Sequence, residues 1–206
     1  MADHLGGVAD GQTPLDPDEA AALLRPAVTT RGELDIVEQE NIARGIRWAF
    51  GRARRPGDVL SESFLRDLHR RMFGNVWGWA GMYRTTARNI GVDAWSIQQA
   101  IGELLGDARY WVEHETFQPD ELCVRFHHRL VAAHPFPNGN GRHARLAADV
   151  LAESLGGSRF EWGRGLRLDA KGMRDRYITA LRAADAGSVD DLVAFARART
   201  PPPPSP

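Results

Sequence analysis

The stretch HPFPNGNGRHAR, residues 134–145, places a histidine, a glycine-rich turn and two arginines close together. Gly139 and Gly141 permit a tight turn with exposed backbone N–H groups, and a helical pattern follows at once. Because the first N–H groups of a helix lack partners and its dipole favours negative charge, this turn suits an anion. Arg142 and Arg145 share one helix face. Guanidinium groups match phosphate oxygens in pairs, so the stretch predicts a cradle for at least two phosphates.

His134 comes directly before this cradle, at the end of the preceding helical pattern. An ordinary histidine pKa of about 6.5 suits a general base at neutral pH. A base beside a phosphate cradle indicates activation of a hydroxyl group that attacks a phosphate. A metal cluster of His134 with His127, His128 and His143 is disfavoured, because adjacent helical histidines point in different directions and no HExxH spacing occurs.

Each part of the motif also has a structural interpretation. A histidine after a helix is commonly a packing residue, a GNG sequence is commonly only a turn, and an arginine pair on a helix is commonly a solvated face. Their combination in this order and spacing favours a functional site over three unrelated structural features.

Composition indicates one soluble domain with a sizeable core. The chain has 206 residues, a net charge of −1, 43% hydrophobic and 26% charged residues, so no overall basic field attracts nucleic acid or anionic lipid. Cys123 is the only cysteine, which excludes an internal disulfide and a cysteine metal cluster. Without a long apolar run or a signal-peptide pattern, we expect a cytoplasmic protein that does not bind a membrane.

Apolar periodicity predicts a mostly helical chain with no repeat and no second domain. An aromatic, glycine-punctuated segment near residues 82–97 instead predicts a short β-hairpin. The expected helices cover residues 16–25, 33–51, 61–74, 96–113, 118–134, 141–156, 171–187 and 188–199.

The opening stretch resembles the signature of Fic-domain proteins, HPFx(D/E)GNGRxxR, and the similarity extends over roughly residues 45–198. FGNVWGWAGMYRT is similar to the family's loop before its flap, and WGR and RDRYITALRAAD to its C-terminal helices. The resemblance implies a Fic-type helical bundle with a small β-hairpin flap near the active site. It divides the chain into a partly disordered N-terminal extension (1–28), an inhibitory helix region (29–51), the Fic domain (52–198) and a disordered Pro-rich tail (199–206).

Most characterised Fic proteins transfer AMP from ATP to a hydroxyl group of a target protein, and the resemblance implies this adenylyltransferase activity here, with Mg²⁺. His134 would deprotonate a Ser, Thr or Tyr hydroxyl of the target. Phe136 would point into the core and anchor the loop. The hairpin at residues 82–97 would pair with an extended segment of the target.

Phosphate contacts also follow from the resemblance. Asn140 and the amides of the turn at Gly139 and Gly141 would hold phosphate oxygens and stabilise developing charge. Arg142 and Arg145 would bind the β- and γ-phosphates.

Asn138 departs from the family pattern, which has Asp or Glu at this position as the metal ligand. An asparagine offers a neutral carbonyl oxygen, so we expect Asn138 to bind Mg²⁺ weakly. Other Fic-type reactions therefore stay open, including phosphorylation, transfer from another nucleotide and removal of AMP.

Many Fic proteins carry an inhibitory helix with the pattern (S/T)xxxE(G/N), whose glutamate pairs with the second arginine of the motif. IVEQEN, residues 36–41, resembles it and makes Glu40 the expected inhibitory residue, although Ile36 replaces Ser or Thr. Residues 29–33 also fit TxxxE. The alternative is that Glu38 and Glu40 are solvent-facing helix charges.

The N-terminal pattern TPLDPDEAAALL…TTRGELDIVEQENI resembles the start of a bacterial subfamily, mobile mystery protein B. This resemblance implies a mobile-element setting and a helix-turn-helix companion protein, with homo-oligomerisation left open. A nucleotide-sensing, toxin–antitoxin-like module is therefore a further alternative to catalysis.

Overall fold

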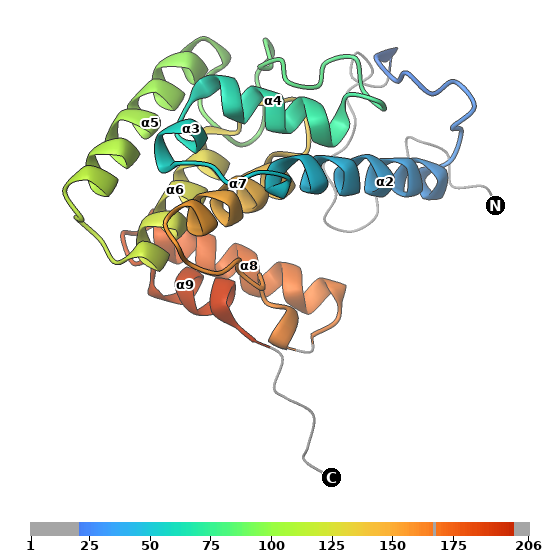
Figure 1. Ribbon diagram of the computed structural model, residues 1–206. Coiled ribbons are helices and arrows are strands. Elements are labelled where there is room, and N and C mark those ends of the chain that lie inside the picture. The colour runs from blue at the N-terminus through green and yellow to red at the C-terminus, as the bar shows by residue number, and fades with distance from the viewer. Residues whose placement is uncertain (1–20, 167, 200–206) are drawn as a thin grey trace.

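The computed structural model describes residues 21–166 and 168–199, which form helices joined by loops (Figure 1). The predicted mostly helical fold is confirmed. Short 3₁₀ turns, η1 (Ala94–Ser96) and η2 (Arg164–Leu166), interrupt the loops. The α-helices are α2 (Arg31–Phe50), α3 (Pro56–Val59), α4 (Glu62–Phe73), α5 (Ile97–Glu113), α6 (Pro119–Ala133), α7 (Asn140–Ser154), α8 (Ala170–Asp185) and α9 (Asp190–Arg197).

Helix α7 lies at the centre of the fold and contacts α2, α3, α4 and α6 (Figure 1). Most of its side chains are buried, whereas Arg142, Arg145 and Asp149 are only partly so. Small residues let the neighbouring helices approach closely: Ala144, Ala147 and Ala148 are fully buried. The N-terminus of α7 carries the GNGRHAR segment, so the phosphate cradle is built on the helix that the core holds most firmly.

Helix α2 packs across α4 and α7. Its start is a capping box, in which the Glu33 side chain accepts from the backbone N–H of Thr30 and the Thr30 hydroxyl accepts from that of Glu33. The TxxxE pattern at residues 29–33 is therefore a helix cap. Gly45 lets α2 approach α4, because a Cβ at this position would lie 2.7 Å from the Met72 Cγ atom.

The β-hairpin predicted near residues 82–97 is not confirmed. Residues 82–93 run as a loop that ends in η1, and the described residues contain no β-ladder. The guanidinium group of Arg84 donates instead to the backbone carbonyls of Thr86 and Val92. A buried side chain thus takes the place of cross-strand hydrogen bonds in holding the two arms of this loop together.

The first half of the predicted helix at residues 16–25 lies outside the described residues. Of its described part, residue 21 is helical, and Leu23 forms an isolated antiparallel bridge with Trp77. The disorder predicted in residues 1–28 falls mainly on residues 1–20, which are not described, and that of residues 199–206 on the undescribed tail.

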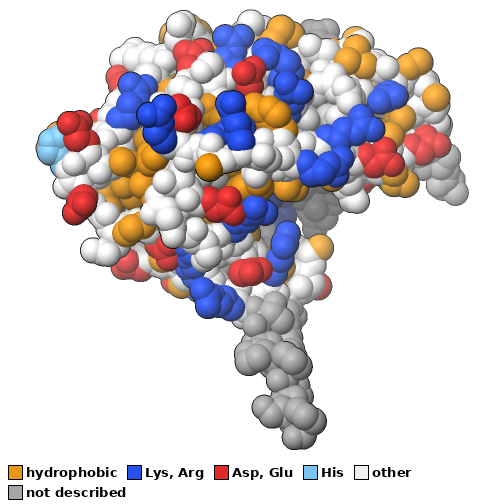
Figure 2. Space-filling model, viewed as in Figure 1, with side chains coloured by type: hydrophobic (Ala, Val, Ile, Leu, Met, Phe, Trp, Pro, Cys, Tyr) orange, Lys and Arg blue, Asp and Glu red, His pale blue; other side chains and the backbone are white. Residues whose placement is uncertain are grey.

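Charged side chains of both signs are interspersed with apolar ones on the face seen in Figure 2. Among the described residues, no helix combines the length and the apolar character that crossing a bilayer requires.

Candidate active site

The HPFPNG segment forms the loop between α6 and α7. His134 closes α6 in the left-handed conformation, with φ 48° and ψ 56°, and Gly139 precedes α7 with φ 78°. A Cβ at Gly139 would lie 2.6 Å from the ring of Phe73. The turn therefore requires glycine for both its backbone angle and its close contact with α4.

Phe136 is fully buried under this loop. Its ring stacks on the ring of His69, with centroids 3.8 Å apart, and meets His143 edge-on at 5.0 Å. His69 also bonds the loop: its Nδ1 accepts from Gly81 N–H at 3.0 Å, so its Nε2–H donates to the carbonyl of Asn138 at 3.0 Å. No local pattern singles out His69, because its role depends on α4 packing beneath a loop about 70 residues away.

Asn140 has a different role from the predicted phosphate contact. Its Oδ1 accepts from the Phe136 N–H at 2.9 Å, and its Nδ2 donates to the Phe136 carbonyl at 2.8 Å. Both ends of the amide are used to close the loop, because a buried amide must satisfy its polar atoms. Side-chain contact with phosphate is therefore left to the two arginines.

The N-terminus of α7 and the two arginines line one cavity of about 470 Å³. No side chain caps the helix at Gly139, so N–H groups of its first turn are directed at this cavity. Arg142 and Arg145 both line it. The Arg145 guanidinium lies over the Tyr177 ring, 5.3 Å from its centroid. This arrangement is suited to bind a polyphosphate.

A glutamate of α2 already occupies part of this cradle, but it is not the predicted one. Glu40 is exposed and lines a separate small cavity beside Arg44. Glu38 is buried, and its Oε2 accepts from Arg142 Nη1 at 2.7 Å. The pairing is thus with the first arginine of the motif, whereas the sequence pattern predicted the second, Arg145.

Side chains two positions apart on a helix point in directions that differ by about 200°, so Glu38 and Glu40 cannot face the same site. The spacing of buried residues along α2 indicates Glu38, which the family pattern did not. Leu34, Glu38 and Asn41 follow the i, i+4, i+7 spacing of one face, and all three are buried.

The general-base candidate His134 is held by its backbone. Its carbonyl accepts from Arg84 Nε at 2.7 Å, and its N–H donates to Val131 at 3.1 Å. Gly91 of the loop lies against it, since a Cβ there would be 2.5 Å from the His134 Cβ. Arg84 is itself buried, and sequence reasoning missed it because the loop hides a cation that binds only carbonyl oxygens.

Burial lowers the pKa of His134 to about 4, and the positive charges of Arg84 and Arg88 act in the same direction. The imidazole is therefore neutral at neutral pH and able to accept a proton. Phosphate groups bound in the adjacent cradle would oppose the effect of the arginines and raise this pKa toward neutrality, which would make His134 a better base when the nucleotide is present.

Buried neutral histidines make the fold sensitive to acid. Burial also lowers the pKa of His127 to about 3 and of His143 to about 4. Their contribution to stability is fully present above pH about 6.5 and is lost as the pH falls, by about 1.4 kcal/mol per pH unit for each histidine. Asp149, whose pKa burial raises to about 6, opposes this effect.

We therefore expect the free energy of unfolding, measured with urea, to fall by several kcal/mol between pH 7.5 and 5.5. In His134→Ala, the decrease in the free energy of unfolding should be smaller by the contribution of one histidine. Equal stability at both pH values would contradict the burial of these groups in neutral form.

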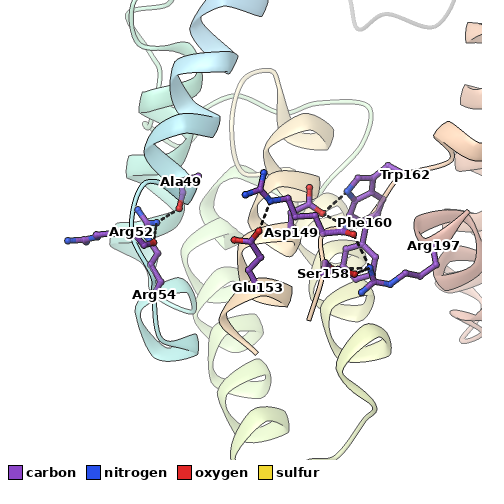
Figure 3. Close-up of polar contacts among 10 residues, drawn as sticks. Ala49, Arg52, Arg54, Asp149, Glu153, Ser158, Phe160, Trp162 and Arg197 are labelled. Atoms are coloured by element: carbon purple, nitrogen blue, oxygen red, sulfur yellow. Dashed lines mark hydrogen bonds and ion pairs between the residues drawn. The ribbon is translucent and has the colours of Figure 1, made fainter. Parts of the chain in front are cut away.

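The far wall of the cavity comes from the C-terminal helices and the loop before them. Trp162 lines it, and its Nε1 donates to the Asp149 Oδ1 atom of α7 at 3.0 Å, while the Phe160 N–H donates to the same atom at 3.1 Å (Figure 3). Tyr177 adds its hydroxyl, 3.0 Å from His127 Nε2. The Trp162–Asp149 and Tyr177–His127 bonds fix these two aromatic side chains beside the arginines and keep the cavity open.

The residues at the expected magnesium position fit this ion poorly. The Asn138 Oδ1 atom accepts from the Gly139 N–H at 2.6 Å, and an amide oxygen carries no charge to attract Mg²⁺. The carboxylates that line the cavity are Asp35 and Glu38, and Glu38 is paired with Arg142. Within the described ranges, no three His, Cys, Asp or Glu side chains form a metal-binding group. Mg²⁺ is usually held by one or two carboxylates with substrate phosphates.

The family model of the Fic/DOC family matches residues 59–152. Residues 59–152 form a Fic domain. This match covers α4 to α6, most of α7 and the whole HPFPNGNGRHAR segment, which confirms the resemblance seen in the sequence. The comparisons do not test the likeness to mobile mystery protein B, which stays a prediction.

Curated relatives of this Fic domain are named as adenylyltransferases. Protein adenylyltransferase fic-1 of Caenorhabditis elegans is 35% identical over 98 residues, which are 46% of this chain and 19% of that protein. Protein adenylyltransferase Fic of Nematostella vectensis is 22% identical over 157 residues, 74% of this chain and 37% of that protein. The chain thus spans well under half the length of these relatives.

Solved structures of Fic domains share the fold. A Fic-domain signaling protein of Bacteroides thetaiotaomicron has a TM-score of 0.62 at 19% identity, over 88% of this chain and 74% of that one. The N-terminal Fic domain of a VirB-translocated Bep effector of Bartonella quintana, with bound ADP, has a TM-score of 0.66 at 16% identity, over 84% and 87%. At these identities the likeness shows the fold alone.

Proposed function

We propose that this chain is a protein adenylyltransferase, which transfers AMP from ATP to a Ser, Thr or Tyr hydroxyl of a target protein and is inhibited by Glu38. One observation carries the proposal: a neutral His134 lies beside the anion cradle of a Fic domain, and a glutamate of α2 occupies that cradle. We retain residues 29–51 as the inhibitory region and residues 52–198 as the Fic domain.

In the proposed reaction, His134 takes the proton of the target hydroxyl as its oxygen attacks the α-phosphorus of ATP. The bond between that phosphorus and the oxygen bridging to the β-phosphate breaks, and pyrophosphate leaves. N–H groups at the start of α7 stabilise the charge that develops on the α-phosphate. Arg142 and Arg145 hold the departing phosphates. No residue of this chain is assigned to hold Mg²⁺ in this reaction, because those at the expected position fit the ion poorly.

A second groove, of about 980 Å³, is the proposed place of the nucleoside. It shares His134, Gly141 and Tyr177 with the phosphate cavity, so a nucleotide could extend from one into the other. Its walls include Ile90 of the loop and Ile178 of α8. Apolar walls with a few polar groups are typical of sites for small molecules. The target's segment would then approach His134 along the loop at residues 82–93.

Glu38 inhibits, in this proposal, by competing with phosphate for Arg142. The Oε2 atom of Glu38 and the nearest nitrogen of Arg142 are 2.7 Å apart, a distance that leaves no space for a phosphate oxygen between them. A nucleotide must therefore displace a buried carboxylate before its terminal phosphates can settle. The alternative in which Glu38 is a solvent-facing charge does not agree with its burial.

Labelling with ATP tests the reaction directly. The purified protein would be incubated with a bacterial lysate and either α-³²P-ATP or γ-³²P-ATP, as wild type and as Glu38→Gly. AMP transfer predicts protein label from the α-labelled nucleotide alone, and more of it in Glu38→Gly. Label from γ-labelled ATP alone would establish phosphorylation instead, and no label from either would exclude ATP as the donor.

Asn138→Asp should make the reaction respond more strongly to Mg²⁺. The new carboxylate supplies a charged oxygen ligand where the wild type has a neutral one. In the Glu38→Gly background, we expect the Mg²⁺ concentration for half-maximal labelling to fall about tenfold, comparable to the effect of a ligand-shell change on metal affinity. An unchanged concentration would show that position 138 does not contact the metal.

A nucleotide-sensing module is the second candidate, favoured by the neutral Asn138. In that case, Glu38→Gly would bind ATP, by calorimetry, yet leave protein unlabelled. The helix-turn-helix companion remains a prediction under either function.

A further inference from the structure

The inhibitory carboxylate has a second partner besides Arg142. The Nε1–H of Trp77 donates to Glu38 Oε1 at 2.7 Å, while Arg142 Nη1 donates to Oε2 at 2.7 Å. Trp77 is 2% exposed, and its ring stacks on Trp79 with centroids 5.1 Å apart. Each oxygen of Glu38 is thus held by a separate donor, and only one of these donors belongs to the phosphate cradle.

The segment that carries Trp77 is held in turn by the start of the described chain. Leu24 N–H donates to Val76 O at 2.8 Å, and Gly78 N–H donates to Ala22 O at 2.9 Å, which makes the antiparallel bridge between residues 23 and 77. The Arg25 Nε atom adds a bond to the carbonyl of residue 75, at 2.9 Å. Residues 22–25 therefore strap the outer side of the loop whose indole faces Glu38.

We propose that Trp77 is a positioning residue for the inhibitory carboxylate, and that the strap of residues 22–25 keeps Trp77 in place. This inference rests on the proposed inhibition by Glu38. A continuous set of contacts then connects the strap to Arg142: backbone bonds to the 76–78 segment, the indole bond to Glu38 and the ion pair.

The expected direction follows from geometry. The indole is fixed in the core, so a Glu38 side chain that moves out of the way of phosphate also leaves the Trp77 N–H without its acceptor. An unsatisfied buried donor is costly, and this cost adds to the barrier against nucleotide binding. Removing the N–H should therefore favour the nucleotide-bound state.

Trp77→Phe, with Trp79→Phe as the matched control, isolates this bond. Both changes shorten a buried, stacked indole, but the Nε1 of Trp79 has no hydrogen-bond partner among the described residues. The readout is the dissociation constant of ATP by calorimetry, which needs no target protein and no turnover. We expect Trp77→Phe to tighten ATP binding about tenfold, as for loss of one charge-assisted hydrogen bond, and Trp79→Phe to change it less than twofold.

Glu38→Gly and the double variant Glu38→Gly, Trp77→Phe separate the two proposals. If Glu38→Gly fails to tighten ATP binding, inhibition by Glu38 is wrong. If Glu38→Gly tightens binding but Trp77→Phe does not, inhibition stands and the role of Trp77 is overturned. Trp77→Phe should add nothing once Glu38 is absent, because both act through one carboxylate; an additive effect would also overturn the role.

Leu24→Pro tests the strap and remains informative if Trp77→Phe fails to fold. Proline removes the N–H that bonds Val76, whereas Leu24→Ala retains it, and the Leu24 side chain is 53% exposed, so neither change disturbs the core. We expect ATP to bind several-fold more tightly to Leu24→Pro than to Leu24→Ala. Equal affinities would show that the strap does not hold the inhibited state.

Discussion

His134→Ala in the Glu38→Gly background should lower the rate of AMP transfer by about 10²–10⁴-fold, the contribution typical of a general base. Without the imidazole, the described residues that line the cavity offer no other histidine to take the proton of the target hydroxyl. The rate would be measured as label from α-³²P-ATP incorporated at saturating ATP, so that loss of chemistry is not confused with loss of binding.

ATP affinity supplies the control for this variant. In the proposed site, the arginines and the α7 N-terminus would bind the phosphates without help from His134, so the dissociation constant should stay within about threefold of the parent. A variant that binds ATP equally well and also labels its target at the parent's rate would remove His134 from the mechanism.

Arg84→Met should have the largest effect on stability. It removes the donor that bonds the carbonyls of Thr86, Val92 and His134. The His134 carbonyl is buried, and loss of a buried hydrogen-bond partner costs about 1–3 kcal/mol. We expect the free energy of unfolding in urea to fall by about 3 kcal/mol or more. Because the same bonds hold the backbone of His134, AMP transfer should fall with it even where the protein remains folded.

Two comparisons make the Arg84 result specific. Arg84→Lys should recover only part of the stability, since an ammonium group cannot match a fork that serves three carbonyls. Arg55→Met changes a side chain that is 91% exposed and should shift stability by less than about 0.5 kcal/mol. Similar losses in Arg84→Met and Arg55→Met would show that the buried guanidinium does not hold the loop.

The residues that match the family signature lie close together in the sequence, and for this reason the sequence predicted much of the site. His134, the glycine turn, Arg142 and Arg145 lie within one loop and the first turns of one helix, so their spacing alone places them together. Helix positions were predictable for a related reason: apolar periodicity and end signals such as Ser61 at the start of α4 act over a few residues.

The inhibitory residue required the tertiary structure. A pattern match chose Glu40, but a carboxylate can pair with Arg142 only from the face of α2 that packs on the core, and that face presents Glu38. The predicted hairpin is not confirmed, for a similar reason. The aromatic, glycine-punctuated segment suggested paired strands, whereas a buried arginine can bond the two arms of a loop without any ladder.

By itself, the sequence determined the helical class, the family resemblance and the parts of the site that lie within residues 134–145. Only the tertiary structure decided which residues from elsewhere meet that segment: Glu38, itself bonded by Trp77, at Arg142, His69 beneath the loop, and Arg84 behind His134. The reason is physical. These contacts join residues separated by about 40 to 100 positions, and no local propensity specifies which side chains long-range packing brings together.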